Sequence, residues 1–215
     1  MTSLLRLPQR GLRAGFTLIE LLAVILIISI LAVALGPMVL EAVGASKVSA
    51  CQANLRKVHS GITLYQMKYK RLPNESGVKF FAQLYSRQAI APSKSNAEIF
   101  LCPGVDRGAV AVDGLPWEEW WSDLDTITGD YSTYAGRDTA NYPLRQLTAT
   151  EALMSDDNDG GMNHPTTTNV LFGDGSVQQY ELVLLREEGL LAEGDEILFV
   201  GPDSPIEALR KLSLD

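Results

Sequence analysis

A stretch of uncharged, mostly apolar residues at positions 21–40 constrains this chain more than any other part of its sequence. As a helix, the stretch would be about 30 Å long, which matches the hydrocarbon core of a bilayer. Glu20 directly precedes it, at a position where a carboxylate is costly to bury without a partner. The sequence therefore predicts a membrane helix with a functional acidic residue at its start.

Charges are unevenly distributed around this helix. Residues 1–15 carry only basic charges, at Arg6, Arg10 and Arg13. Without these three cations the chain would have 15 basic and 26 acidic side chains, a net charge of -11 instead of -8. Because positive residues mark the cytoplasmic side of a membrane, we expect a cytoplasmic N-terminus and an acidic body outside. An acidic body also argues against a nucleic-acid partner, which requires a basic face.

Two other kinds of N-terminal segment compete with this interpretation. A secretory signal peptide has a shorter apolar region followed by a small-residue cleavage site, which Ala32, Ala34 and Gly36 could imitate. A plain signal anchor needs only the apolar stretch. Neither alternative explains the carboxylate of Glu20 in the first helical turn.

The helical pattern continues beyond the membrane stretch. Apolar residues recur at alternating steps of three and four, the spacing of one buried face of an amphipathic helix. They are Val48, Cys51, Leu55, Val58, Ile62, Tyr65 and Tyr69. The pattern ends at Pro73, because proline and its predecessor disfavour helix.

These patterns divide the chain into three parts. Residues 1–15 form a leader, residues 16–40 a membrane helix, and residues 41–215 a globular domain that starts with amphipathic helix at 41–70. Within the membrane helix, Gly36 and Pro37 are expected to kink or locally unwind the chain.

Shorter elements are expected in the globular domain. Residues 169–172 and 176–180 flank Gly173-Asp174-Gly175 and predict a tight β-hairpin, since Asp-Gly favours the positive φ of such turns. Short helices are expected at 79–88, 182–189 and 204–212, a short strand or extended segment at 99–103, and a short strand at 197–200.

Three indoles form an aromatic cluster with acidic neighbours: Trp117, Trp120 and Trp121. We expect these side chains to pack over the core. The alternative is an exposed surface that stacks on sugars or peptides.

One acidic loop suggests a metal site. Residues 156–161 read Asp-Asp-Asn-Asp-Gly-Gly, and oxygen donors at this density suit Ca²⁺, although the spacing does not match an EF-hand. A calcium site is one interpretation and a solvated acidic turn is the other. The candidate calcium ligands are Asp156, Asp157, Asn158, Asp159 and Asp174.

The chain has two cysteines and two histidines. Cys51 and Cys102 are candidates for a disulfide in an oxidising compartment, and two separate buried thiols are the alternative. The spacing of these residues with His59 and His164 matches no zinc motif, and His59 is expected at the surface. No catalytic motif or phosphate-binding loop is recognisable, so the sequence predicts no enzyme.

Near its N-terminus the chain resembles the prepilin leader of type IV pilins and type II secretion pseudopilins. The matching residues are Gly15-Phe16-Thr17-Leu18-Ile19-Glu20-Leu21-Leu22, with Pro37 further along the helix. A second segment, His164 followed after nine residues by Asp174-Gly175, resembles the His-x9-Asp-Gly pseudopilin-like proteins. The segments that start at Cys51 and Cys102 are similar to segments of the same group.

The resemblance implies a fold and a processing site. The fold is α+β and pilin-like, a long N-terminal helix packed against a small antiparallel sheet. A prepilin peptidase would cut between Gly15 and Phe16, and the new amine of Phe16 would be N-methylated. Glu20 would then pair with the Phe16 amine of a neighbouring subunit, because a buried carboxylate with a cationic partner escapes much of its desolvation cost.

The function implied is that of a structural subunit of a type II secretion pseudopilus. Such a subunit crosses the bacterial inner membrane once, places its globular domain in the periplasm, and assembles with other pilin-like subunits on an inner-membrane platform. The alternatives are a type IV pilus subunit for adhesion, motility or DNA uptake, and a membrane-anchored binding domain. Calcium in the C-terminal loop of the secretion system's major pseudopilin adds to the case for calcium here.

Overall fold

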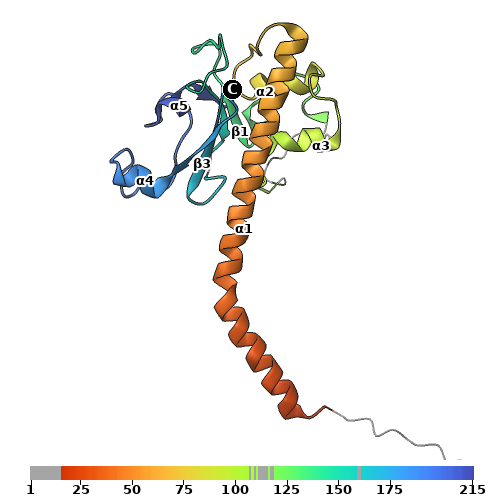
Figure 1. Ribbon diagram of the computed structural model, residues 1–215, viewed down its shortest axis with the longest axis vertical. Coiled ribbons are helices and arrows are strands. Elements are labelled where there is room, and N and C mark those ends of the chain that lie inside the picture. Colours follow the sequence, from red (N-terminus) through yellow and green to blue (C-terminus); the bar gives the residue numbers. More distant parts are fainter. Residues whose placement is uncertain (1–15, 107, 109, 111–115, 117–118, 159–160) are drawn as a thin grey trace, which may run out of the picture. The chain divides into compact units, whose positions relative to one another are not determined.

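The structure is a computed structural model that describes residues 16–106, 108, 110, 116, 119–158 and 161–215 (Figure 1). The chain divides into two compact units, Met1–Val43 and Gly44–Asp215. One helix, α1 (Leu18–Tyr69), begins in the first unit and ends in the second. The two units differ in where they place their apolar side chains.

The described part of the first unit exposes its apolar side chains. Between residues 16 and 43 every residue is exposed except Gly36, which is intermediate. One 18-residue window of α1 has a mean hydropathy of 3.0 and none of it is buried, so the helix is long and apolar enough to cross a membrane. Gly36 and Pro37 lie within the continuous helix, so the chain does not unwind there, and a kink stays a prediction.

The part of α1 in the second unit buries one face. Its fully buried apolar residues follow alternating steps of three and four: Cys51, Leu55, Val58, Ile62 and Tyr65. Arg56 and Lys57, which lie off this face, are exposed. The buried face predicted from the spacing is therefore confirmed.

A five-stranded antiparallel sheet forms the centre of the second unit, in the order β4-β3-β2-β1-β5. The strands are β1 (Tyr134–Arg137), β2 (Ala152–Asp156), β3 (Thr167–Phe172), β4 (Val177–Glu181) and β5 (Leu212–Ser213). The long helix and this sheet confirm the predicted α+β, pilin-like fold.

Short helices connect and cover the strands. They are α2 (Val78–Ser86), α3 (Lys94–Ala97), α4 (Leu182–Glu187) and α5 (Glu207–Arg210), with 3-10 turns η1 (Glu98–Phe100) and η4 (Gly129–Tyr131). The helices α2 and α4 confirm the predictions at 79–88 and 182–189.

The hairpin of β3 and β4 is also confirmed. The two strands pair in register from Thr167 opposite Glu181 to Leu171 opposite Val177. In the turn between them Gly175 has a φ of 85°, a conformation that favours glycine.

The sheet separates two apolar cores. In β3, Leu171 belongs to the first core, together with α1, α2 and η1, while its neighbours Val170 and Phe172 belong to the second core, under α4 and α5. A register shift in β2 places Leu153 and Met154 together in the first core. Figure 1 shows the second half of α1 passing along the side of β1 and β3.

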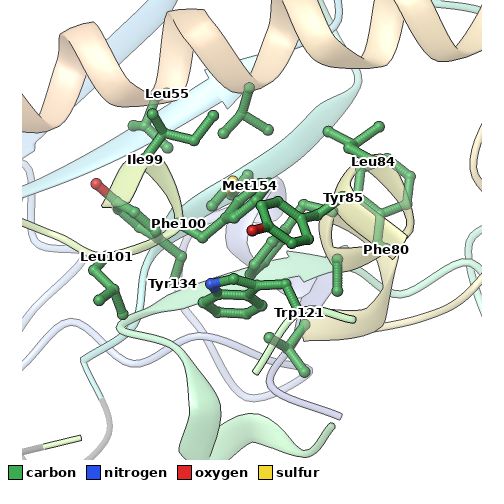
Figure 2. Packing of buried hydrophobic residues seen from close by; sticks show 14 of the residues in the cluster. Leu55, Phe80, Leu84, Tyr85, Ile99, Phe100, Leu101, Trp121, Tyr134 and Met154 are labelled. Atoms are coloured by element: carbon green, nitrogen blue, oxygen red, sulfur yellow. The ribbon is translucent and has the colours of Figure 1, made fainter. Parts of the chain in front are cut away.

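Aromatic side chains fill much of the first core (Figure 2). Trp121 is fully buried, and its ring centroid lies 5.1 Å from that of Phe100 and 6.2 Å from that of Phe81. Trp120 is buried as well. These two indoles are therefore core residues, as expected, and Trp117 lies outside the described residues.

Three predicted elements differ from the structure. Residues 99–103 start inside the 3-10 turn η1, which continues directly from α3, so no strand forms there, and Leu101 directly after the turn has extended backbone. Residues 197–200 form no strand, since Leu198 O accepts a side-chain hydrogen bond from Asn158 instead of pairing with a strand. The helix predicted at 204–212 is limited to α5, because Leu212 pairs with β1 as part of β5.

Candidate functional site

The first candidate site is the start of α1. Thr17 precedes the helix, and its hydroxyl accepts a hydrogen bond from Glu20 N at 3.3 Å. In return, Glu20 Oε2 accepts from the backbone N and the hydroxyl of Thr17, both at 2.9 Å. This reciprocal pair is a capping box, which satisfies backbone N–H groups that a helix start leaves unpaired.

The capping box fixes a carboxylate close to Phe16. Glu20 is exposed and is the only charged residue between positions 16 and 40. Phe16 is 83% exposed. Gly15 lies outside the described residues, so the cleavage site stays a prediction, while Phe16 and Glu20 are placed within one helical turn of each other.

A second candidate site lies inside the second unit. Four side chains form it, here named the buried cluster: Cys51, Cys102, Asp156 and His164. None of them is more than 2% exposed, and their ligand atoms all lie within 4.8 Å of one another. They come from α1, the turn after η1, the end of β2, and the loop between β2 and β3.

Short contacts join the members of the buried cluster. Cys51 Sγ lies 3.0 Å from Asp156 Oδ1, and Cys102 Sγ lies 3.3 Å from His164 Nε2. His164 Nε2 in turn lies 3.8 Å from Asp156 Oδ1. The sulfur, nitrogen and oxygen atoms therefore surround one small volume.

Neighbouring donors hold these atoms in place. Asp156 Oδ2 accepts from the backbone N and the side-chain amide of Asn169, at 2.7 and 2.8 Å. The hydroxyl of Tyr134 lies 3.3 Å from Cys51 Sγ, and Gly104 N donates to Cys102 Sγ at 3.3 Å. Donors of this kind stabilise negative charge on oxygen and sulfur.

The loop that carries His164 is fixed by its own hydrogen bonds. Asn163 Nδ2 donates to Thr133 O at 2.6 Å, and Asn163 N donates to Asn158 Oδ1 at 3.2 Å. A Cβ at Gly104 would lie 2.9 Å from His164 Cε1, so a glycine is needed where this turn approaches the ring.

Burial and proximity shift the pKa values in the buried cluster. Burial raises the pKa of Asp156. The hydrogen bond between the two cysteines raises the pKa of Cys51 and lowers that of Cys102 to about 6. Burial lowers the pKa of His164, but its contacts with Cys102 and Asp156 outweigh burial, so its pKa is raised overall. The arrangement thus favours anionic sulfur at Cys102 beside His164.

The predicted disulfide does not form in the structure, where Cys51 and Cys102 are both free thiols. Two separate buried thiols, the alternative, agree with this unbonded state, and the two sulfur atoms lie within 4.8 Å of each other. Long-range packing of α1 against the turn after η1 brings them together.

The predicted calcium ligands have different surroundings. Asp156 is the last residue of β2 and faces the buried cluster, so its assignment to a loop was wrong. Asn158 is buried and both atoms of its side-chain amide are hydrogen-bonded within the domain. Asp157 is half-buried, and Asp159 lies outside the described residues. Calcium binding by this loop stays a prediction.

Asp174 lies in the hairpin turn. Its Oδ1 accepts hydrogen bonds from the hydroxyl and the backbone N of Ser176, at 2.6 and 2.9 Å, and these bonds lower the pKa of Asp174. His59 is half-buried instead of lying at the surface, and its Nε2 lies 2.9 Å from Gly173 O in the same turn. The two ends of the His-x9-Asp-Gly segment therefore have separate places, His164 in the buried cluster and Asp174 in the turn.

Comparison with protein-family models identifies the first site. Residues 10–36 match the prokaryotic N-terminal methylation motif. Comparison with curated proteins and with solved structures gives no match. The chain thus carries a type IV pilin-like prepilin leader on a pilin-like fold. A leader of this kind implies processing by a peptidase, membrane anchoring, and assembly with other pilin-like subunits, and its class is structural.

The sequence alone does not join the four members of the buried cluster. The cysteines were expected as a pair, Asp156 in an acidic loop, and His164 in a segment that resembles a family. The four residues are scattered between positions 51 and 164, so no local spacing connects them. Burial of Cys51 on the helix was the only part of the site that periodicity could indicate.

Proposed function

We propose that this protein is a pseudopilin, a structural subunit of a type II secretion filament in the bacterial inner membrane. The observation that carries the proposal is the methylation motif at residues 10–36, joined to an apolar helix with no buried residues in its membrane-length window. Cleavage after Gly15 exposes the amine of Phe16, which is then methylated. The N-terminus is cytoplasmic before cleavage and the globular domain is periplasmic.

The exposed half of α1 supplies the assembly surface. Its apolar side chains are exposed in the described part of their unit, residues 16–43, so lipid covers them in the free subunit and other helices cover them in a filament. Apolar contacts alone do not fix the axial position of neighbouring helices in a bundle. The single carboxylate of Glu20, paired with the Phe16 amine of a neighbour, would fix this position.

Two features favour a secretion filament over a pilus that binds surfaces. His164 and Asp174-Gly175 resemble the His-x9-Asp-Gly pseudopilin-like proteins. In addition, Trp120 and Trp121 are buried in the core and so do not form an aromatic binding surface.

Mass spectrometry of the mature N-terminus tests the processing step. We expect a product that begins at methylated Phe16. A product cleaved near Gly36 would identify an ordinary signal peptide and contradict the proposal.

Variants of the capping box separate the two roles of Glu20. Glutamine can replace glutamate in a capping box, so Glu20→Gln keeps the helix start but removes the charge. We expect this variant to be cleaved and methylated normally and to form no filaments, while Thr17→Val, which keeps the charge and removes the cap, still assembles. Glu41→Gln, an exposed charge further along α1, is the matched control. Normal filaments from Glu20→Gln would show that charge pairing is not required.

A further inference from the structure

We propose that the buried cluster is a structural zinc site in which Cys51, Cys102, Asp156 and His164 supply the four ligands. Two thiolates, an imidazole and a carboxylate are all ligand types that zinc binds, and structural zinc sites use four protein ligands. The site lies entirely within Gly44–Asp215 and is independent of the leader and the proposed filament contact.

The separations between ligand atoms suit one tetrahedral ion. Zinc lies about 2.0–2.3 Å from its ligands, so two ligands at a tetrahedral angle are roughly 3.3–3.8 Å apart. Two separations fall in this range, 3.3 Å for Cys102–His164 and 3.8 Å for His164–Asp156, whereas Cys51–Asp156, at 3.0 Å, is at hydrogen-bond distance and would lengthen slightly around an ion. No pair of ligand atoms in the buried cluster exceeds 4.8 Å.

The orientation of His164 also points to an ion. Its Nε2 faces both Cys102 Sγ and Asp156 Oδ1, and a single N–H cannot align with both of these acceptors. A nitrogen lone pair directed at an ion between the two acceptors accounts for both approaches. Metal-bound histidines use a neutral ring nitrogen in this way.

Burial of the charges gives a third argument. The two cysteines and Asp156 each bind metal in the anionic form, and all three side chains are excluded from solvent. These three groups can be anionic together in a dry interior only with a cation between them, because otherwise they repel each other and lose their hydration. A divalent cation at their centre offsets both effects.

The surrounding groups orient the ligands as outer groups do in metal sites. Asn169 holds Asp156 Oδ2 with two hydrogen bonds, which leaves Oδ1 toward the centre of the buried cluster. Gly104 N donates to Cys102 Sγ, and the hydroxyl of Tyr134 contacts Cys51 Sγ. Hydrogen bonds of this kind fix ligand geometry and tune metal affinity.

A disulfide between the two cysteines explains less of this arrangement. Oxidation would remove both thiol protons, so Asp156 Oδ1 would face a sulfur that donates nothing. His164 and Asp156 would remain buried beside an uncharged bridge. The convergence of all four side chains is accounted for by zinc and not by a disulfide.

The closed surroundings assign the zinc a structural role. Catalytic zinc sites keep one position open for water or substrate, whereas here all four ligands are protein side chains and none is more than 2% exposed. The ion would connect the amphipathic half of α1 to the turn after η1, to the end of β2 and to the loop after it. Its function is to clamp the helix to the sheet.

The first test measures the metal and the thiols in the full-length protein, purified in detergent without chelators. We expect one zinc ion per chain by elemental analysis. We also expect an intact mass, under non-reducing conditions, that corresponds to two reduced cysteines. Protein that holds no zinc and takes up no Zn²⁺ after mild chelation would overturn the proposal, as would a Cys51–Cys102 disulfide in protein isolated from its own membrane.

The second test replaces zinc by Co²⁺, whose absorption reports its ligands. We expect intense visible bands of a tetrahedral site and a near-ultraviolet band from thiolate ligands. Cys51→Ser or Cys102→Ser should each remove roughly half of the thiolate band, since one of two sulfur ligands is lost. His164→Gln should weaken binding, while His59→Gln, the other histidine, is the matched control and should bind normally.

The zinc proposal can fail or hold independently of the filament proposal. Glu20→Gln should retain one zinc per chain even though it does not assemble. Wild-type Co²⁺ spectra that are octahedral and lack a thiolate band would contradict the site, whether or not any variant folds.

Discussion

The two units of this chain treat apolar and ionisable side chains in opposite ways, although one helix runs through both. Between residues 16 and 40, α1 exposes its apolar side chains and carries one carboxylate. Between Cys51 and Tyr65 it buries its apolar face in a core, and an ionisable cluster is buried with it. Helical structure alone therefore does not determine what a segment contacts; the distribution of side chains around the helix does.

Each unit also contains acidic side chains for which a cationic partner is proposed. In the first unit the proposed partner of Glu20 comes from another subunit. In the second unit the proposed partner of the buried cluster is an ion. If both proposals hold, the same electrostatic requirement would lead to assembly in one unit and to internal cross-linking in the other.

The largest effect is expected from removing the central indole of the first core. Trp121→Ala should lower the free energy of unfolding of the second unit by about 3–5 kcal/mol, because the side chain is fully buried among aromatic rings. Phe199→Ala, an aromatic side chain that is 55% exposed, is the control and should have little effect. Urea unfolding of the detergent-solubilised chain, followed by circular dichroism, measures both.

A matched pair of leucines on α1 tests the contrast directly. Leu55→Ala should destabilise the second unit by about 3 kcal/mol, since it leaves a cavity in a packed core. Leu31→Ala, on the exposed part of the same helix, should leave that unfolding free energy unchanged. Equal changes in unfolding free energy for the two variants in the same urea experiment would contradict the distinction between the two parts of the helix.

A matched pair of glycines gives a smaller effect. Gly175→Ala should cost about 1–2 kcal/mol, because the position has a positive φ and a Cβ would lie 3.0 Å from His59 Nδ1. Gly36→Ala meets no atom within 4 Å and should be tolerated. Thermal unfolding measures the stability of both variants. A Gly175→Ala protein as stable as the wild type would contradict the turn geometry.

The smallest effect concerns pH. Hydrogen bonds from Ser176 lower the pKa of Asp174 in the folded chain, so ionised Asp174 stabilises the fold above its ordinary pKa, and this contribution is lost as pH falls through the lowered value. The difference in Tm between wild type and Asp174→Asn should therefore be present above about pH 4 and disappear in stronger acid. Ser176→Ala should show part of the same pattern, and a difference that grows in acid would contradict it.

The parts of the fold that the sequence predicts are those coded by local spacing. The buried face of α1 repeats every three or four residues, and Asp174-Gly175 marks the turn of the hairpin. The strands β1 and β2 give no such signal, because both faces of these short strands are buried and their residues do not alternate in polarity.

The two candidate sites also differ in whether local spacing in the sequence reveals them. Phe16 and Glu20 lie one helical turn apart, so a contiguous motif reveals them. The buried cluster depends on Asp156 at the end of β2, where a carboxylate resembles the start of a loop, and on side chains that meet only after the chain folds. Its residues could be recognised singly from the sequence, but their proximity could not.

The hydrogen bonds between Thr17 and Glu20 have a consequence for the unassembled protein. A subunit alone in the bilayer does not carry an orphaned anion, since the carboxylate already accepts two bonds within its own chain. In the proposed filament, assembly would exchange these hydrogen bonds of Glu20 for the Phe16 amine of a neighbour. The carboxylate would therefore have a partner both before and after assembly, so the unassembled subunit would be a stable precursor.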